Sequence, residues 1–193
     1  DFTKVEAIGG RAIQLLEENH LEKDCFGMGS SPYSSICNYY GASLGYMGRF
    51  KEANSSLEKG LRNACAVNDK LSMALAHLFH STVAHLAGYG DDTITHAHEA
   101  IKICEEAEIT SGLEAAWFLL GAGYYLRGDY GKAIDTGEKS LKLAKEFGIP
   151  FNASWSYFCL AATLRDTGDL KRARECAQEA LRISKECNSK LCE

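Results

Sequence analysis

The chain has 193 residues, of which 46% are hydrophobic and 24% are charged, and its formal net charge is −5. This composition is typical of a folded protein and excludes an intrinsically disordered one. No basic stripe points to nucleic acid, and no apolar run approaches the roughly 18 residues that a membrane-spanning helix needs. We therefore expect a cytoplasmic protein whose partners include neither nucleic acid nor a membrane.

Eight cysteines raise the question of disulfides or a metal site. They form no C-x-x-C pair, and their spacing fits no zinc motif. Cys104 falls where other repeats of the chain, described below, carry Ala or Ser, which predicts a small buried side chain. We expect reduced thiols, no metal and no cofactor.

The first predicted element is a helix over residues 2–19, with Ile8, Ala12, Leu15 and Leu16 on one face. Its sequence aligns with the second helix of the later repeats, so residues 1–32 are interpreted as a partial repeat followed by a long loop. Glycine, serine and proline are concentrated in residues 27–32, which predicts a loop over residues 20–32. We expect this loop to be the most mobile internal segment.

From residue 33 onward the sequence repeats every 40 residues. One column of the repeat holds Gly48, Gly88, Gly128 and Gly168. Columns of small and of aliphatic residues at a fixed period indicate stacked helical hairpins. The sequence therefore predicts a single repeat domain over residues 1–193, with full repeats at 33–72, 73–112, 113–152 and 153–192.

Each repeat predicts two helices. The first helices are expected at 33–47, 71–87, 111–127 and 151–167, and the second helices at 50–67, 91–107, 129–147 and 169–187. The glycine column lies just past each first helix, where a left-handed residue ends the helix and glycine adopts that conformation without penalty. Asp69 and Ser111 are expected to cap helix N-termini.

A second column places a small residue inside each first helix. Its members are Gly41, Ser81, Gly121 and Ala161. Two helices approach to about 8–10 Å only where the side chains at the crossing are short. This column therefore predicts the contact between the two helices of each repeat.

The pattern Trp117-x-x-Leu120-Gly121-x-x-Tyr124, followed by small residues at Ala133 and Ser140, resembles the tetratricopeptide repeat. It departs from that family in its longer period, in the absence of the closing Pro and in the Gly that occupies position 137 instead of a large residue. The segments GYYLRGDY and GDLKRARECAQEALRIS resemble the repeat regions of multidomain bacterial signalling proteins that carry an ATPase and an adenylate/guanylate cyclase domain. The resemblance implies an all-α, right-handed superhelix of about nine helices in stacked antiparallel pairs, a tetratricopeptide-like α-solenoid.

Catalytic motifs are missing from the sequence. The glycines at 121 and 123 lie within a predicted helix and not between a strand and a helix, so they form no phosphate loop. No Ser/His/Asp or Cys/His arrangement has its motif context, and we expect no enzyme and no catalytic residue. His77 and His80, three residues apart on one helix, could chelate a metal, but both occupy packing columns, which favours packing or partner-facing histidines.

The resemblance also implies a concave groove lined by the first helices. The candidate partner-binding residues of this groove are Asn38, Tyr46, His85, Phe118, Tyr125, Trp155, Phe158 and Arg165. Aromatic area combined with an arginine is typical of binding hot spots. The competing interpretation is that Phe118 and Phe158 merely fill the interior of the superhelix.

Two functions remain open from the sequence. The first is a protein-protein interaction and regulatory scaffold of a larger signalling protein, which binds a peptide, a partner domain or another domain of its parent chain. The second is a small-molecule sensor arm of a bacterial signalling or transcription-regulating ATPase.

The ends of the chain carry a further expectation. The chain begins at Asp1 without a Met and stops at Glu193, where another helix would begin, so we expect a fragment of a longer protein. The last predicted helix would then expose an apolar stripe that includes Ala173, Ala177, Ala180 and Leu181. Because exposed apolar stripes associate, we expect a weak homodimer through this helix.

Overall fold

The computed structural model describes residues 2–110 and 112–187, and within these ranges the chain forms nine α-helices and no strand. The helices are α1 (Phe2–Glu18), α2 (Pro32–Tyr46), α3 (Phe50–Ala66), α4 (Lys70–Leu86), α5 (Gly90–Glu106), α6 (Leu113–Arg127), α7 (Tyr130–Glu146), α8 (Pro150–Asp166) and α9 (Leu170–Glu186). Each predicted helix is present, with its ends within a few residues of the predicted ones. The predicted all-α class is confirmed.

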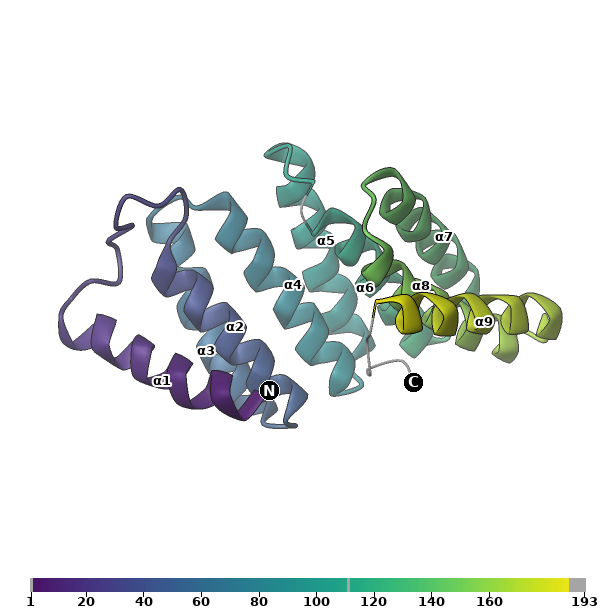
Figure 1. Cartoon of the computed structure of the whole chain (residues 1–193), viewed down its shortest axis with the longest axis horizontal. Helices are drawn as coiled ribbons and strands as arrows, with labels where there is room; N and C mark the ends of the chain where they lie inside the picture. Colours follow the sequence, from purple (N-terminus) through teal and green to yellow (C-terminus); the bar gives the residue numbers. More distant parts are fainter. Residues whose placement is uncertain (1, 111, 188–193) are drawn as a thin grey trace.

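Helices that follow one another in sequence also pack against one another, so the chain forms a curved row from α1 to α9 (Figure 1). The first helices α2, α4, α6 and α8 also contact each other in succession. In the described part of the chain the second helices α3, α5, α7 and α9 make no such contact with each other. The first helices therefore form the inner, concave layer of the row, and the second helices form the outer layer.

The glycine column ends the first helices as predicted. Gly48, Gly88, Gly128 and Gly168 all have a positive φ, between 77° and 88°. A Cβ added at any of them would meet no atom within 4 Å, so the requirement for glycine comes from the backbone conformation and not from crowding. For other residues the left-handed conformation costs roughly 1–2 kcal/mol.

The column of small residues brings the two helices of a repeat together. A Cβ at Gly41 would lie 2.7 Å from Cγ of Leu57 and 2.9 Å from the backbone oxygen of Ala53. A close approach between α7 and α8, which belong to consecutive repeats, explains why the chain departs from the tetratricopeptide pattern at Gly137. There a Cβ would lie 2.9 Å from Cδ2 of Leu160, because Leu160 of α8 occupies the space that a large residue at 137 would need.

The loop between α1 and α2 is anchored at its end. The backbone N–H of Ser31 donates to Oδ2 of Asp69 over 2.7 Å, and Oδ1 of Asp69 accepts from the N–H of Ser72 over 3.0 Å. Asp69 therefore caps α4 as predicted. The other predicted cap, Ser111, lies outside the described residues. Burial raises the pKa of Asp69, but the hydrogen bonds from Ser31 and Ser72 outweigh it and hold that pKa below its ordinary value. The mobility of this loop stays a prediction.

Only part of the apolar stripe predicted on α9 is exposed. Ala173 and Ala180 are buried, since they face the interior of their own repeat. The exposed apolar side chains are Ala177, Leu170 and Leu181. The surface available for association is accordingly smaller than the sequence suggests.

The cysteines of the described residues form no disulfide, and Cys104 is buried as predicted. Burial raises the pKa of the Cys104 thiol to about 11. Within the described ranges, no helix has both the length and the apolar character that crossing a membrane would require.

Candidate functional site

A cavity of about 280 Å³ opens on the concave layer. All of its lining residues come from the four first helices. They are Tyr46 of α2; Phe79, Thr82, His85 and Leu86 of α4; Glu114, Ala115, Phe118 and Leu119 of α6; and Asn152, Trp155, Phe158 and Cys159 of α8. We call this cavity the concave pocket.

Aromatic rings form much of the wall of the concave pocket. The ring centroids of Phe118 and Trp155 lie 6.4 Å apart at an interplanar angle of 54°, a tilted pair within the range of favourable aromatic contacts. Tyr46 of α2 also lines the pocket and is 43% exposed. The wall therefore offers apolar area and ring faces to an incoming group.

Phe158 is much more exposed than other residues of its repeat column. In its repeat column Asn38 and Leu78 are buried, whereas Phe158 is 55% exposed. Asn38 contacts the next first helix, because its Nδ2 donates to the backbone oxygen of Ser72 over 3.0 Å. No first helix follows α8 in the described residues, so the exposure of Phe158 follows from its place in the row.

A buried carboxyl group lies at the base of the concave pocket. Glu114, in the first turn of α6, has no exposed surface. Its Oε2 accepts a hydrogen bond from Nδ2 of Asn152 over 2.8 Å, and its Oε1 is buried without a hydrogen-bond partner among the described residues. Burial raises the pKa of the Glu114 carboxyl, and hydrogen bonds from Asn152 and from the backbone of Ala115 oppose this shift in part.

His85 adds a second unpartnered polar atom to the concave pocket. Its Nδ1 is buried and has no hydrogen-bond partner in the part of the chain that the structure describes. Burial lowers the pKa of His85 below its ordinary value, so the imidazole is neutral at pH 7. A neutral imidazole offers one nitrogen as an acceptor.

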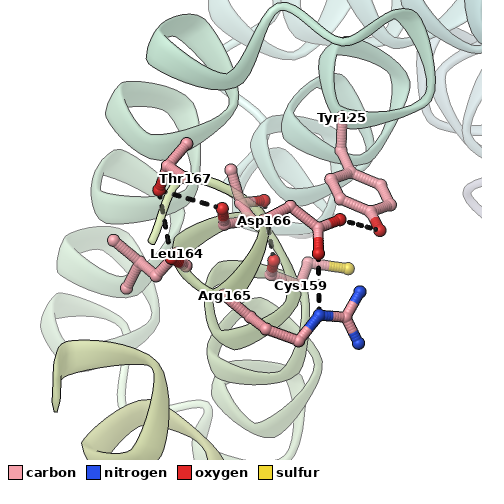
Figure 2. A network of polar contacts seen from close by, with 7 residues as sticks. Tyr125, Cys159, Leu164, Arg165, Asp166 and Thr167 are labelled. Carbon is pink, nitrogen blue, oxygen red and sulfur yellow. Dashed lines mark hydrogen bonds and ion pairs between the residues drawn. The ribbon is translucent and has the colours of Figure 1, made fainter. Parts of the chain in front are cut away.

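Tyr125, Asp166 and Arg165 form a polar network farther along α6 and α8. The hydroxyl of Tyr125 donates to Oδ2 of Asp166 over 2.9 Å, and Nε of Arg165 donates to Oδ1 over 2.7 Å (Figure 2). Asp166 lies seven residues after Cys159, hence on the same face of α8, two turns beyond the concave pocket. The hydrogen bonds from Arg165 and then from Tyr125 lower the pKa of Asp166.

The structure thus divides the predicted groove residues into three places. Tyr46, His85, Phe118, Trp155 and Phe158 line the concave pocket together. Tyr125 and Arg165 lie beyond it, with Arg165 bound to Asp166. Asn38 is fully buried between helices and is not on the groove surface. The binding role of these residues stays a prediction.

Sequence reasoning missed Glu114 and Asn152. A signal was present for Glu114, because its repeat column holds Ser34, Ala74 and Ser154, which are all buried. A glutamate in a column of small buried residues stands out. For Asn152 no comparable signal exists, since residues near a helix start vary widely.

The histidine cluster lies between α4 and α5. Nδ1 of His77 lies 3.0 Å from Nδ1 of His96, and the ring of His80 stacks on His96 at a centroid distance of 4.7 Å. Burial, followed by the neighbouring charges of His96 and His77, lowers the pKa of His80 to about 4. Among the described residues no group of three or more histidine, cysteine, aspartate or glutamate side chains is arranged to hold a metal ion. The contacts are those of packed side chains.

Comparisons with known proteins agree with the repeat pattern. Residues 112–186 match the family model described as Tetratricopeptide repeat. A search of the curated proteins finds no match. The matched residues cover α6 to α9, and within that range α6 and α8 supply eight of the thirteen residues that line the concave pocket.

Solved structures resemble most of the row of helices. Aspartyl phosphate phosphatase F from Bacillus subtilis superposes with a TM-score of 0.71 at 14% identity, over 82% of this chain and 42% of that chain. A Rap protein complexed with Competence and Sporulation Factor superposes with a TM-score of 0.74 at 13% identity, over 82% of this chain and 44% of that one. The third structure is the Signal Transduction ATPase with Numerous Domains protein with a tetratricopeptide repeat sensor, from Pyrococcus horikoshii. It superposes with a TM-score of 0.68 at 19% identity, over 95% of this chain and 28% of that chain.

At these identities the likeness concerns the fold, and this chain spans less than half the length of each of the three proteins. The fold is a tetratricopeptide-like helical solenoid, as the repeat pattern predicts. Solenoids of stacked repeats form extended concave surfaces.

Proposed function

We propose that this tetratricopeptide-like array is a protein-interaction domain that binds a peptide or a segment of a partner along its concave layer. The bound segment contacts the aromatic wall of the concave pocket and continues toward Tyr125 and Arg165. The domain serves as a regulatory arm of a larger bacterial signalling protein in the cytoplasm. Its partner is a separate protein or another domain of the same parent chain.

One observation carries the proposal. Four helices that are distant in sequence each contribute side chains to a single concave pocket, and those side chains include aromatic rings and unpartnered polar atoms. A preformed pocket loses little conformational entropy on binding, which favours its use as a binding surface.

Two of the similar structures support the regulatory part of the proposal. One carries a repeat array described as a sensor, and the other was solved in complex with a factor. Both place a comparable row of helices in a longer chain.

The second candidate is a small-molecule sensor. The lining of the concave pocket favours it, because aromatic and apolar side chains surround a few polar groups, as in small-ligand sites. Its volume of about 280 Å³ is just below the roughly 300 Å³ at which such sites begin. A metabolite that fills this pocket would raise the midpoint of thermal unfolding, whereas a domain that reads only peptides would not respond.

The test is selection of binders from a displayed library of random peptides, followed by affinity measurements on variants. We expect Trp155→Ala and Tyr46→Ala to weaken the selected peptides about tenfold or more, as hot-spot aromatics do. Tyr89→Ala, which removes an exposed aromatic side chain outside the concave pocket, is the matched control and keeps the affinity. If no peptide is selected and metabolites stabilise the domain, the sensor function replaces the proposed one.

A further inference from the structure

We propose that the concave pocket accepts a cationic side chain, the ammonium group of a lysine or the guanidinium group of an arginine, which pairs with Glu114. This inference rests on the proposed function and specifies the chemistry of the bound segment. It assigns to Glu114 and Asn152 the recognition of a positive charge. Phe118, Trp155 and Phe158 contact the aliphatic stem and the face of the charged group.

The position of Glu114 is the first argument. The three other repeats place Ser34, Ala74 and Ser154 in its column, and all three are buried. A small side chain therefore satisfies the packing of this column. A buried carboxylate is unfavourable unless it is paired and hydrogen-bonded, so packing does not account for a glutamate here.

The incomplete set of partners around Glu114 is the second argument. Asn152 donates to Oε2, but Oε1 has no hydrogen-bond partner among the described residues. Asn152 lines the same pocket and holds the carboxyl group in position. Because Glu114 has no exposed surface, binding requires a small movement of the pocket side chains that opens Oε1. An ammonium or guanidinium group then supplies the missing donor together with the missing opposite charge.

The other groups of the concave pocket are compatible with a cation. None of its lining residues is Lys or Arg. Nδ1 of His85 is a second buried atom without a partner, and in the neutral imidazole it can accept a hydrogen bond. Aromatic ring faces attract cations within about 6 Å. The nearby guanidinium of Arg165 is bound to Asp166, so its charge is compensated locally.

An anionic or a neutral occupant fits these groups less well. An anion would meet a carboxyl group and no cationic side chain in the lining. A neutral apolar group would leave Oε1 of Glu114 and Nδ1 of His85 without partners. Both alternatives are outcomes of the test.

The test is NMR titration of the isotope-labelled chain with four small probes at constant ionic strength. The probes are n-butylammonium, n-butylguanidinium, pentanamide as the neutral control and pentanoate as the anionic control. The reporter is the indole N–H of Trp155, which lines the concave pocket. The indole N–H of Trp117 is the internal reference, because that ring lies outside the pocket, with Nζ of Lys139 3.4 Å from its centroid.

We expect the two cations to shift the Trp155 signal saturably, with no shift of Trp117 and none from pentanoate. Glu114→Gln keeps the shape of the side chain and an acceptor for Asn152, and it should weaken the cations about tenfold or more. Asp135→Asn removes one exposed charge from α7 and is the matched control, with unchanged binding. Phe158→Leu keeps apolar area at an exposed position without a ring, and should weaken the cations several-fold even if Glu114→Gln does not fold.

The inference is overturned if pentanamide binds as well as the cations, or if Glu114→Gln binds the cations with unchanged affinity. The peptides selected by display separate this outcome from failure of the proposed function. Peptides that bind the concave layer without a lysine or arginine requirement contradict only the cation-binding role. Absence of any bound peptide contradicts the proposed function, while the small probes still report on the pocket.

Discussion

Asn152 and Glu114 join the first turns of α8 and α6 through a hydrogen bond of 2.8 Å from Nδ2 to Oε2. The two residues lie 38 positions apart in sequence, and their bond connects two consecutive first helices. It also fixes the carboxyl group at the base of the concave pocket. Loss of either partner should therefore affect both the stability of the row and the chemistry of the pocket.

We predict that Asn152→Ala destabilises the fold. The substitution removes the side-chain donor of a buried carboxyl group, which costs about 1–3 kcal/mol. Urea denaturation of the purified domain measures the change. Asn54→Ala, at an exposed position of α3, is the control and should alter the free energy of unfolding by less than about 0.5 kcal/mol. An equal stability of Asn152→Ala and the wild type would contradict the role of the bond.

A second prediction concerns pH and Glu114. Burial raises the pKa of this carboxyl above its ordinary value of 4.5 in the folded state. Its contribution to stability is therefore fully present below pH 4.5 and is lost as pH rises through the folded-state pKa. The wild type should lose stability relative to Glu114→Gln over this rise in pH.

Urea denaturation of both proteins at several pH values checks this difference. Asp135→Asn, whose carboxyl is exposed, should show no such divergence from the wild type. A constant difference between Glu114→Gln and the wild type across the pH series would show that the Glu114 carboxyl has an ordinary pKa.

The histidine cluster predicts the opposite dependence of stability on pH, a loss of stability as the pH falls. Burial and the adjacent histidines lower the pKa of His80 to about 4 from an ordinary value of 6.5. Its stabilising contribution is present above pH 6.5 and is lost as pH falls toward 4, since the unfolded chain takes up the proton first. Besides its two neighbours in the cluster, His77 and His96, the titratable groups nearby are Asp92 and Glu99, whose charges raise the pKa of His96.

His80→Leu places in this column the residue found at Leu120 and Leu160. We expect the variant to gain stability over the wild type as the pH is lowered from 7 to 5. His98→Leu, at an exposed position of the partner helix, is the control. A pH-independent difference between His80→Leu and the wild type would contradict the lowered pKa.

Packing at Gly137 gives a prediction that does not involve charge. A Cβ at this position would lie 2.9 Å from Leu160, so Gly137→Ala should destabilise the fold by about 1–3 kcal/mol through overpacking. Gly131→Ala in the same helix meets no atom within 4 Å, and should be neutral or stabilising by up to about 1 kcal/mol. Thermal unfolding of the two variants measures the contrast, and equal stabilities would contradict the close approach of α7 and α8.

The helices and their turns were predictable because they follow from a strict period. Gly128 ends α6 because the backbone there has a positive φ, which glycine adopts without penalty. Gly121 lies at a contact between two helices because it has no side chain. Both properties belong to single residues, so they can be recognised without coordinates. The predicted helix ends consequently agree with the observed ones to within a few residues.

The site was only partly predictable, because the direction of a side chain depends on how the rows of helices curve. Asn38 and Phe158 share a repeat column, yet one is buried and the other is exposed at the last first helix of the described row. Ala173 and Ala180 were assigned to an outer stripe, although they face the interior of their repeat. The hydrogen bond between Glu114 and Asn152 depends on how closely α6 and α8 approach each other, which the period of the sequence does not specify.

The most direct test of the account is the binding footprint of a display-selected peptide on the isotope-labelled domain, measured by NMR chemical-shift changes. The account predicts changes confined to the concave helices α2, α4, α6 and α8, with the largest around Trp155 and Phe118. Changes concentrated on α3, α5 and α7, or on the exposed Leu170 and Leu181 of α9, would contradict it.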